Sequence, residues 1–583
     1  MLLPLLLAAV VQAQTAGEVF QQAKQAIDAR QPQKALSLLA PLAPETPDAG
    51  TPKALAPVYL LRGVAELALG NDGAAGARFE TAAALDPGLG AARFNLGRLR
   101  LGQKRYADAA AELRKLIELE PEDASAHHLL GVACHEMGEL GDARQSLQKA
   151  LELQPGNLPS TLRLAAVLSD LGLYQESAAA YDRAIAAGAG TPPVRRALAR
   201  ARLKSGAFPE AAAELERVVN AGESSAAVLV DLGYCFLNTG QFAEARVRFE
   251  EALALEPENR FAQFQLGITL AKLGERDAAI RSLEAALAEP SVQADAHNEL
   301  ARLYTAAGEL DRAVEHCRSA IGQAPYLVDA YYQLGRLLAR QGKAEEAQAT
   351  LARFQELSKV QEEAERLEHA AQIAPDNAGN LFELAKLYRR QGRSGEALEV
   401  VSRAAQLDAD EPAFQRARGE LLLEAGKLDE AERAAAKAVA LSADDAASLH
   451  LAASVLLARG NLKEAEGKLR RSLELSRNNA LAWSDLGVIL SRSGRADEAV
   501  SAFEAAIASD PALALPRNGL GVLYSERGEI EKAVFQFEEA VRLDPDYASA
   551  HLNLAQVLRE LGRDAEALEH EAVYERLEKR PHE

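Results

Sequence analysis

Apolar residues recur along this chain at spacings of three and four, in short segments separated by turns. Residues 482–511 hold two such stripes, formed first by Trp483, Leu486 and Leu490 and then by Ala499, Phe503 and Ile507. Each stripe predicts a helix with one buried face. Gly494 lies between them, where a glycine with positive φ can end the first helix. The pattern therefore predicts two amphipathic helices joined by a tight turn.

The same pattern returns at a fixed interval along the chain. Steps of 34 from Gly63 and from Gly487 meet Gly or Ala at all fifteen places. Twelve residues after each place stands a second small residue, which is Ser177 in one unit and Ala in the others. A larger apolar residue, such as Phe503, usually follows four residues later. A regular small residue indicates a close helix crossing, because a larger side chain would hold the two backbones apart.

This pattern resembles the tetratricopeptide repeat family, whose 34-residue helix-turn-helix unit carries Trp, Leu-Gly and Tyr in its first helix and Ala, Phe, Ala and Pro in its second. The residues in the family's places are Trp483, Leu486, Gly487, Ala499, Phe503, Ala506 and Pro511, then Leu520, Gly521, Tyr524, Ala533, Phe537, Ala540 and Pro545. The resemblance implies an all-α fold, a right-handed α-solenoid in which about 15–16 helix-turn-helix repeats form a superhelix. Residues 158–225 depart from the pattern, since they lack the first-helix Gly and the closing Pro.

Repeats account for nearly the whole chain. We expect a degenerate N-terminal repeat over 16–49, nine units over 56–361 and six over 378–581, of which the last is a polar cap. The register breaks at 362–377, within one long helix predicted over 345–372. That helix is either a docking surface or the remnant of a truncated unit, whose deletion merged two helices into one. No remaining segment approaches the roughly 100 residues of a catalytic domain, so we expect no enzyme.

The N-terminus begins with an apolar run of about ten residues, followed by Val11-Gln12-Ala13. This small-x-small sequence predicts a signal peptide over 1–13, with cleavage near Ala13. The run is too short to span a bilayer, so we expect no stable membrane insertion. No Lys or Arg precedes it, and the alternative is an apolar N-terminus on a cytoplasmic protein. The expected location is periplasmic or secreted.

Charge and spacing argue against several kinds of chemistry. The net charge of −20 disfavours nucleic acid, whose phosphates need clustered Lys and Arg. His128 and His135 are the best metal candidates, but they stand seven residues apart, about 10.5 Å along a helix. The three cysteines lie in distant units and are expected to be small buried thiols. We therefore predict no catalytic, cofactor or metal site.

The resemblance instead directs attention to a groove. In the family, the second, fifth, ninth and twelfth places of each first helix line the concave face. In the units that start at 294, 328 and 378, these places hold Asp295, Asn298, Arg302, Asp329, Tyr332, Arg336, Phe382, Lys386 and Arg389. Cations gather there in an otherwise acidic protein, which favours an extended or acidic peptide held by the cations and packed on the aromatic rings. The alternative is a solvated face, with local ion pairs from Asp295 or Asp329 to a nearby Arg.

Two functions remain open. The first is an exported, non-catalytic protein–protein interaction scaffold that binds other proteins or peptide segments in its groove. The second is a substrate-recruiting or assembly subunit of an enzyme, or of a polysaccharide or protein secretion complex. Similar arrays that recruit substrates carry a ladder of Asn in the groove. Here only Asn95 and Asn553 occupy the sixth place, which weighs against that role.

Overall fold

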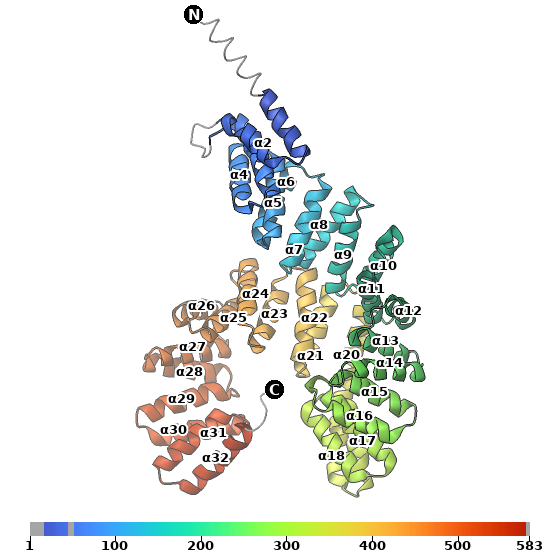
Figure 1. Ribbon diagram of the computed structural model, residues 1–583. Coiled ribbons are helices and arrows are strands. Elements are labelled where there is room, and N and C mark those ends of the chain that lie inside the picture. The colour runs from blue at the N-terminus through green and yellow to red at the C-terminus, as the bar shows by residue number, and fades with distance from the viewer. Residues whose placement is uncertain (1–16, 45–51, 579–583) are drawn as a thin grey trace, which may run out of the picture. The chain divides into compact units, whose positions relative to one another are not determined.

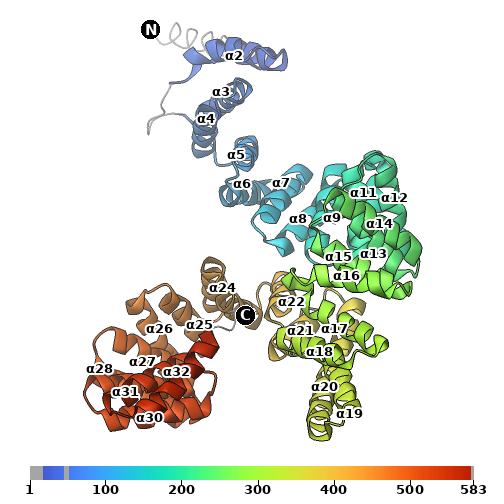
Figure 2. The ribbon, with the colours of Figure 1, turned by 60° about the horizontal axis from the view of Figure 1, so that its bottom comes forward.

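The described part of the chain folds into helices joined by short turns, as the computed structural model shows (Figure 1). It comprises residues 17–44 and 52–578, so the predicted signal peptide over 1–13 lies outside the described residues. The helices form two compact units, Met1–Arg366 with Gln372–Asp376, and Leu367–Ala371 with Asn377–Glu583. Each unit consists of antiparallel helix pairs stacked side by side, which confirms the all-α repeat fold (Figures 1 and 2).

The first unit holds the helices up to α19. A helix covers 17–28, and the short turns of helix are η1 (Ala40–Leu42), η2 (Lys53–Leu55) and η3 (Ile185–Ala189). The α-helices are α2 (Pro32–Leu39), α3 (Ala56–Ala68), α4 (Asp72–Leu85), α5 (Gly90–Gly102), α6 (Tyr106–Leu119), α7 (Ala124–Glu136), α8 (Leu140–Leu153), α9 (Leu158–Asp170), α10 (Tyr174–Ala184), α11 (Pro192–Lys204), α12 (Phe208–Asn220), α13 (Ala226–Asn238), α14 (Phe242–Leu255), α15 (Arg260–Lys272), α16 (Arg276–Ala286), α17 (Pro290–Ala307), α18 (Leu310–Gln323) and α19 (Val328–Arg340).

The second unit holds the helices from α21 onward. They are α21 (Ala378–Arg390), α22 (Ser394–Leu407), α23 (Pro412–Glu424), α24 (Leu428–Leu441), α25 (Ala446–Ala458), α26 (Leu462–Leu475), α27 (Ala480–Arg492), α28 (Ala496–Ser509), α29 (Ala514–Glu526), α30 (Ile530–Leu543), α31 (Ala548–Glu560) and α32 (Asp564–Glu578). In both units the first helix of a pair presents its fifth, ninth and thirteenth residues on one face, because four residues span just over one helical turn.

Local sequence sets where the helices begin and end. Several first helices are capped by the residue before them, as where the Asn479 side chain accepts a hydrogen bond from the Ala482 N–H at 3.1 Å. The turn inside a pair ends on a residue with positive φ, and Gly494 has φ 74°. The corresponding place after α5 is Lys104, which adopts φ 58° without being a glycine.

In several pairs the glycine of the first helix lies against the large residue of its own second helix, whereas Gly419 of α23 lies closest to Leu451 of α25. A Cβ placed on Gly487 of α27 would come within 2.6 Å of the Phe503 ring on α28. The same contact joins Gly131 of α7 to Leu147 of α8, at the same separation along the chain. This is the close crossing that the fixed Gly or Ala predicts, because only a small side chain leaves room for the ring or the leucine.

The long helix α20 covers Ala344–Ile373, where the sequence predicts one helix over 345–372. Its first part pairs with α19, since a Cβ on Gly335 would meet Leu351 at 2.7 Å. Its last part packs in the second unit, where the Tyr388 hydroxyl of α21 donates to Glu368 at 2.6 Å. Both ends thus act as second helices of a repeat, which favours a merged helix over a free docking arm.

Candidate functional site

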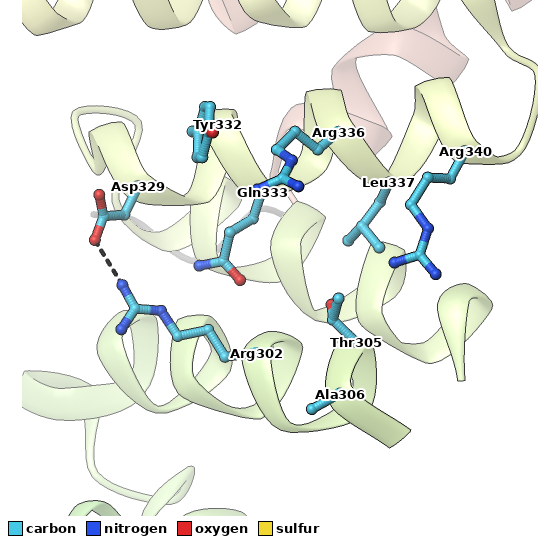
Figure 3. Close-up of a pocket in the computed structure, with 9 residues that line it drawn as sticks. All are labelled: Arg302, Thr305, Ala306, Asp329, Tyr332, Gln333, Arg336, Leu337 and Arg340. Atoms are coloured by element: carbon cyan, nitrogen blue, oxygen red, sulfur yellow. Dashed lines mark hydrogen bonds and ion pairs between the residues drawn. The ribbon is translucent and has the colours of Figure 1, made fainter. Parts of the chain in front are cut away.

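A pocket of about 360 Å³ opens between α17 and α19 in the first unit (Figure 3). Its lining consists of Arg302, Thr305, Ala306, Asp329, Tyr332, Gln333, Arg336, Leu337 and Arg340. Four of these residues are among those predicted from the sequence: Arg302, Asp329, Tyr332 and Arg336. They meet because the second, fifth and ninth places of adjacent units, counted from 294 and 328, share one face.

Arg302 and Asp329 face each other across this pocket (Figure 3). The guanidinium of Arg302 donates to the Asp329 carboxylate at 2.9 Å, and its other nitrogen lies 3.4 Å from Glu299. Burial raises the pKa of Glu299, while Arg302 and Lys272 oppose that shift. Arg302 is thus already neutralised by two carboxylates, as the alternative of a solvated face with local ion pairs anticipates.

Arg336 and Arg340 differ from Arg302, because no carboxylate of residues 17–44 and 52–578 comes within 4.0 Å of either. Both are exposed and lie one helical turn apart on α19. The Arg336 guanidinium lies 5.5 Å from the centre of the Tyr332 ring, which itself packs on Phe354 at 5.2 Å. Tyr332 remains 42% exposed. The pocket thus presents two cations beside an exposed aromatic ring and the apolar side chains of Ala306 and Leu337.

The other two predicted residues of α17 do not line this pocket. Asn298 is only 6% exposed, and its side-chain oxygen accepts a hydrogen bond from Gln333 at 2.7 Å. The Asn298 amide thus holds α17 to α19, and its part in binding a peptide stays a prediction. Asp295 is exposed but is not among the residues that line the pocket.

Phe382, Lys386 and Arg389 belong to α21 of the second unit. Lys386 donates to both carboxylate oxygens of Glu383 at 2.8 Å and lies 5.2 Å from the centre of the Phe382 ring. Arg389 donates to Glu420 at 2.5 Å and to Glu424 at 2.6 Å. Phe382 packs on Phe414 with ring centres 4.9 Å apart. These cations are neutralised by neighbouring carboxylates, so they form a solvated face of the kind that the alternative describes.

Polar groove residues of neighbouring first helices form hydrogen bonds to one another at a separation of 35 residues, one more than the repeat length. A side chain at the fifth place bonds the sixth place of the next first helix, and one at the twelfth bonds the thirteenth. The pairs and their distances are His135–Asp170 at 2.8 Å, Asn298–Gln333 at 2.7 Å, Arg389–Glu424 at 2.6 Å, His450–Asp485 at 3.0 Å and Asn518–Asn553 at 3.0 Å. A hydrogen-bond donor and an acceptor at this separation are the sequence signal for such a pair. The groove positions taken from the family do not reveal it, because they consider each unit by itself.

The histidines that the sequence singles out bind different partners. His128 contacts the Ser160 hydroxyl at 2.9 Å, whereas His135 bonds Asp170. Elsewhere in the described residues, Cys134, Glu139 and Asp142 bring one possible ligand atom each within 4.8 Å of one another. Burial raises the pKa of Cys134 to about 12, and Arg114 already contacts both carboxylates. This chemistry suits an ion pair beside a buried thiol better than a metal site.

Family comparisons agree with the repeat geometry. Models described as tetratricopeptide repeat or TPR repeat match residues 94–157, 135–201, 202–266, 264–327, 304–357, 359–421, 412–437, 450–514 and 523–562. The chain is a tetratricopeptide repeat protein. Proteins of this family generally act as protein–protein interaction scaffolds and are typically non-catalytic. Among curated proteins, none matches this TPR protein significantly.

Several solved structures resemble parts of the TPR protein. YrrB, described as a TPR protein with an unusual peptide-binding site, is 26% identical over 32% of this chain and 96% of its own, with a TM-score of 0.26. MamA from Desulfovibrio magneticus RS-1 is 24% identical over 30% of this chain and 97% of its own, with a TM-score of 0.26. The Naa15/Naa10 complex bound to HypK-THB contains a chain 14% identical over 97% of this one and 94% of its own, with a TM-score of 0.33.

Within residues 17–44 and 52–578, no helix combines the length and the apolar character that a membrane crossing requires.

Proposed function

We propose that this TPR protein is a non-catalytic scaffold that binds an extended peptide segment of another protein in the pocket between α17 and α19. The observation that carries the proposal is the pair Arg336 and Arg340, exposed and without a carboxylate partner among the described residues, beside the exposed Tyr332 ring. Guanidinium groups form strong, often bidentate bonds with carboxylates. The ligand chemistry that fits is an acidic side chain followed by an aromatic or aliphatic one.

We propose a role for each wall of the pocket. Arg336 and Arg340 would hold the ligand carboxylate, while the exposed Tyr332 and Ala306 would contact its apolar side chain. The Arg302–Asp329 ion pair, at 2.9 Å, closes one side of the pocket and leaves Arg302 little free charge. Of the groove cations in the first unit, we therefore propose that Arg336 and the neighbouring Arg340 supply the charge that binds the ligand.

A selection of random peptides displayed on phage tests this function. We expect enriched peptides that combine Asp or Glu with an aromatic or aliphatic residue. Fluorescence polarisation then compares their affinity for wild type, for R336Q/R340Q and for R433Q/K437Q, a control that removes two exposed cations from α24. Loss of about tenfold or more is expected only for R336Q/R340Q, since hydrogen bonds to charged groups contribute about 1.5–3 kcal/mol. Equal affinity for all three proteins would refute the assignment.

We further propose that the protein is exported. The apolar run and Val11-Gln12-Ala13 support this location through their signal-peptide pattern. Expression of the full chain in a bacterium with two membranes, followed by intact-mass measurement of the periplasmic fraction, gives the test. A product that begins at Gln14 supports export, and full-length protein confined to the cytoplasm contradicts it.

A further inference from the structure

A second row of cations lies on α11, away from the pocket between α17 and α19. Arg196, Arg200 and Lys204 occupy the fifth, ninth and thirteenth places of this helix. Since four residues advance a helix by about 6 Å and turn it through little more than one revolution, the three side chains form one stripe about 12 Å long. All three residues are exposed. We call Arg196, Arg200 and Lys204 the α11 stripe.

The α11 stripe differs from the other charged face of the same helix. Arg195 donates to Glu214 at 2.7 Å, and Arg202 donates to Asp182 at 2.9 Å. In contrast, no carboxylate oxygen of the described residues lies within 4.0 Å of the three stripe cations. The packing of α11 against α10 and α12 explains the difference, because those neighbours supply Asp182 and Glu214 to one face only.

One carboxylate lies within electrostatic range of the stripe. Asp231 of α13 is half-buried, and burial raises its pKa, whereas Arg200, Lys204 and Arg196 act in the opposite direction. Asp231 makes no ion pair with any of them at 4.0 Å or less. Three cations therefore face this one half-buried carboxylate, and the surface of the stripe carries a local positive charge in a protein of net charge −20.

We propose that the α11 stripe binds an acidic, extended segment of a partner protein whose carboxylates stand at alternate residues. Alternate side chains of an extended peptide point the same way and repeat about every 6.7 Å, close to the roughly 6 Å spacing of the stripe. Such a segment lying along α11 brings three successive carboxylates opposite Arg196, Arg200 and Lys204. The stripe is separate in sequence from Arg336 and Arg340, so the proposal stands independently of the function proposed for the pocket.

Fluorescence polarisation with two labelled peptides tests the match in spacing. The first repeats Glu-Ser four times, and the second places four Glu before four Ser, so that composition and charge are equal. We expect the alternating peptide to bind about threefold more tightly. The triple variant R196Q/R200Q/K204Q should bind it about tenfold more weakly, because each exposed ion pair contributes less than about 1 kcal/mol. Raising the salt concentration from about 50 to about 500 mM should also weaken binding.

Two variants serve as controls. R183Q/R281Q/K359Q removes two exposed arginines and one lysine from other helices of the first unit, and should bind as wild type does. R336Q/R340Q changes only the pocket and should also retain the alternating peptide. Circular dichroism checks that all variants keep wild-type helicity.

Each remaining outcome overturns the proposal. Equal weakening by both triple variants would show a general effect of net charge. Loss of binding in R336Q/R340Q alone would place the acidic ligand in the pocket, leaving the proposed function intact. Tighter binding of a short oligothymidylate than of the alternating peptide would identify a nucleic acid ligand instead. Light scattering that shows self-association of wild type but not of R196Q/R200Q/K204Q would identify a second copy of the chain as the occupant.

Discussion

The close crossing between α27 and α28 can be tested by adding a single methyl group, with the substitution Gly487→Ala. The Phe503 ring is only 1% exposed and is enclosed from two sides. A Cβ on Gly487 would approach it to 2.6 Å, and a Cβ on Gly519 of α29 would approach its far edge to 2.5 Å. A shift of the ring away from an Ala at 487 therefore moves it towards α29 at Gly519.

The expected cost of Gly487→Ala follows from two opposing effects. Overpacking a filled core costs about 1–3 kcal/mol, and a ring enclosed on both sides places this site in the upper part of that range. Ala in place of Gly within a helix gains about 1 kcal/mol. The net expectation is a loss of about 1–2 kcal/mol in the free energy of unfolding of this repeat.

Gly467→Ala provides the matched control. Gly467 lies inside α26, and a Cβ there meets nothing within 4 Å. Only the gain in helix propensity applies, so this variant should be more stable than wild type by about 1 kcal/mol. The same substitution in two neighbouring helices is thus expected to have opposite signs.

The chain supplies its own probe for this measurement. Trp483 is the single tryptophan and lies in α27 itself, where its indole nitrogen donates to the Arg477 carbonyl at 2.8 Å. Its fluorescence during urea unfolding reports on this repeat, which matters because repeat arrays need not unfold in one step. We expect the midpoint to fall by roughly 0.5–1 M for Gly487→Ala. A midpoint equal to or above that of wild type would refute the close crossing as the reason for the small residue.

Three further predictions follow from individual side chains. Lys104→Gly should stabilise the turn after α5 by up to about 1 kcal/mol, seen as slower hydrogen exchange in α5 and α6, because φ 58° strains a residue with a Cβ. Burial lowers the pKa of His297 and of His316, whose Nδ1 atoms lie 2.8 Å apart. Below about pH 6.5 these histidines bind protons in the unfolded chain but not in the folded chain, so the free energy of unfolding falls as pH falls. Between pH 7.5 and 5.5 the urea midpoint of His316→Phe should therefore fall less than that of wild type. An equal fall in both proteins would contradict this. Finally, all three thiols are buried, and burial raises the pKa of each to about 12; a thiol reagent at pH 8 should label none in the folded protein and all three in guanidinium.

The fold was accessible from the sequence because close packing restricts residue size at a few fixed places. The geometry of one helix pair sets the separation between Gly487 and Phe503 along the chain, and the same restriction acts between Gly131 and Leu147. The long helix α20 also follows from uninterrupted apolar spacing, with no turn residue between Ala344 and Ile373. Lys104 shows the limit of such reasoning, since the turn adopts positive φ there although the sequence offers no glycine.

The candidate site was accessible only in part. Helical periodicity places Tyr332, Arg336 and Arg340 on one face, but the groove places taken from the family end at the twelfth residue and so omit Arg340, the thirteenth, which lines the same pocket. It also cannot tell an exposed amide from a bonded one, and Asn298 is buried because Gln333 of the next first helix reaches it. Lys386 illustrates a signal that was present in the sequence: Glu383 lies three residues before it, a spacing that brings helical side chains into contact.

The hydrogen bonds between side chains of neighbouring first helices limit how such an array can lengthen by duplication. If the unit that starts at 514 were copied alone, Asn518 would meet the sixth-place residue of its own copy, Gly519, which has no side chain to bond. A half-buried amide would then lose the partner that Asn553 provides at 3.0 Å. Copying the two units from 514 to 581 together would preserve that bond within each copy. For this hydrogen bond, the piece that can be copied intact is therefore a module of two neighbouring units rather than a single repeat.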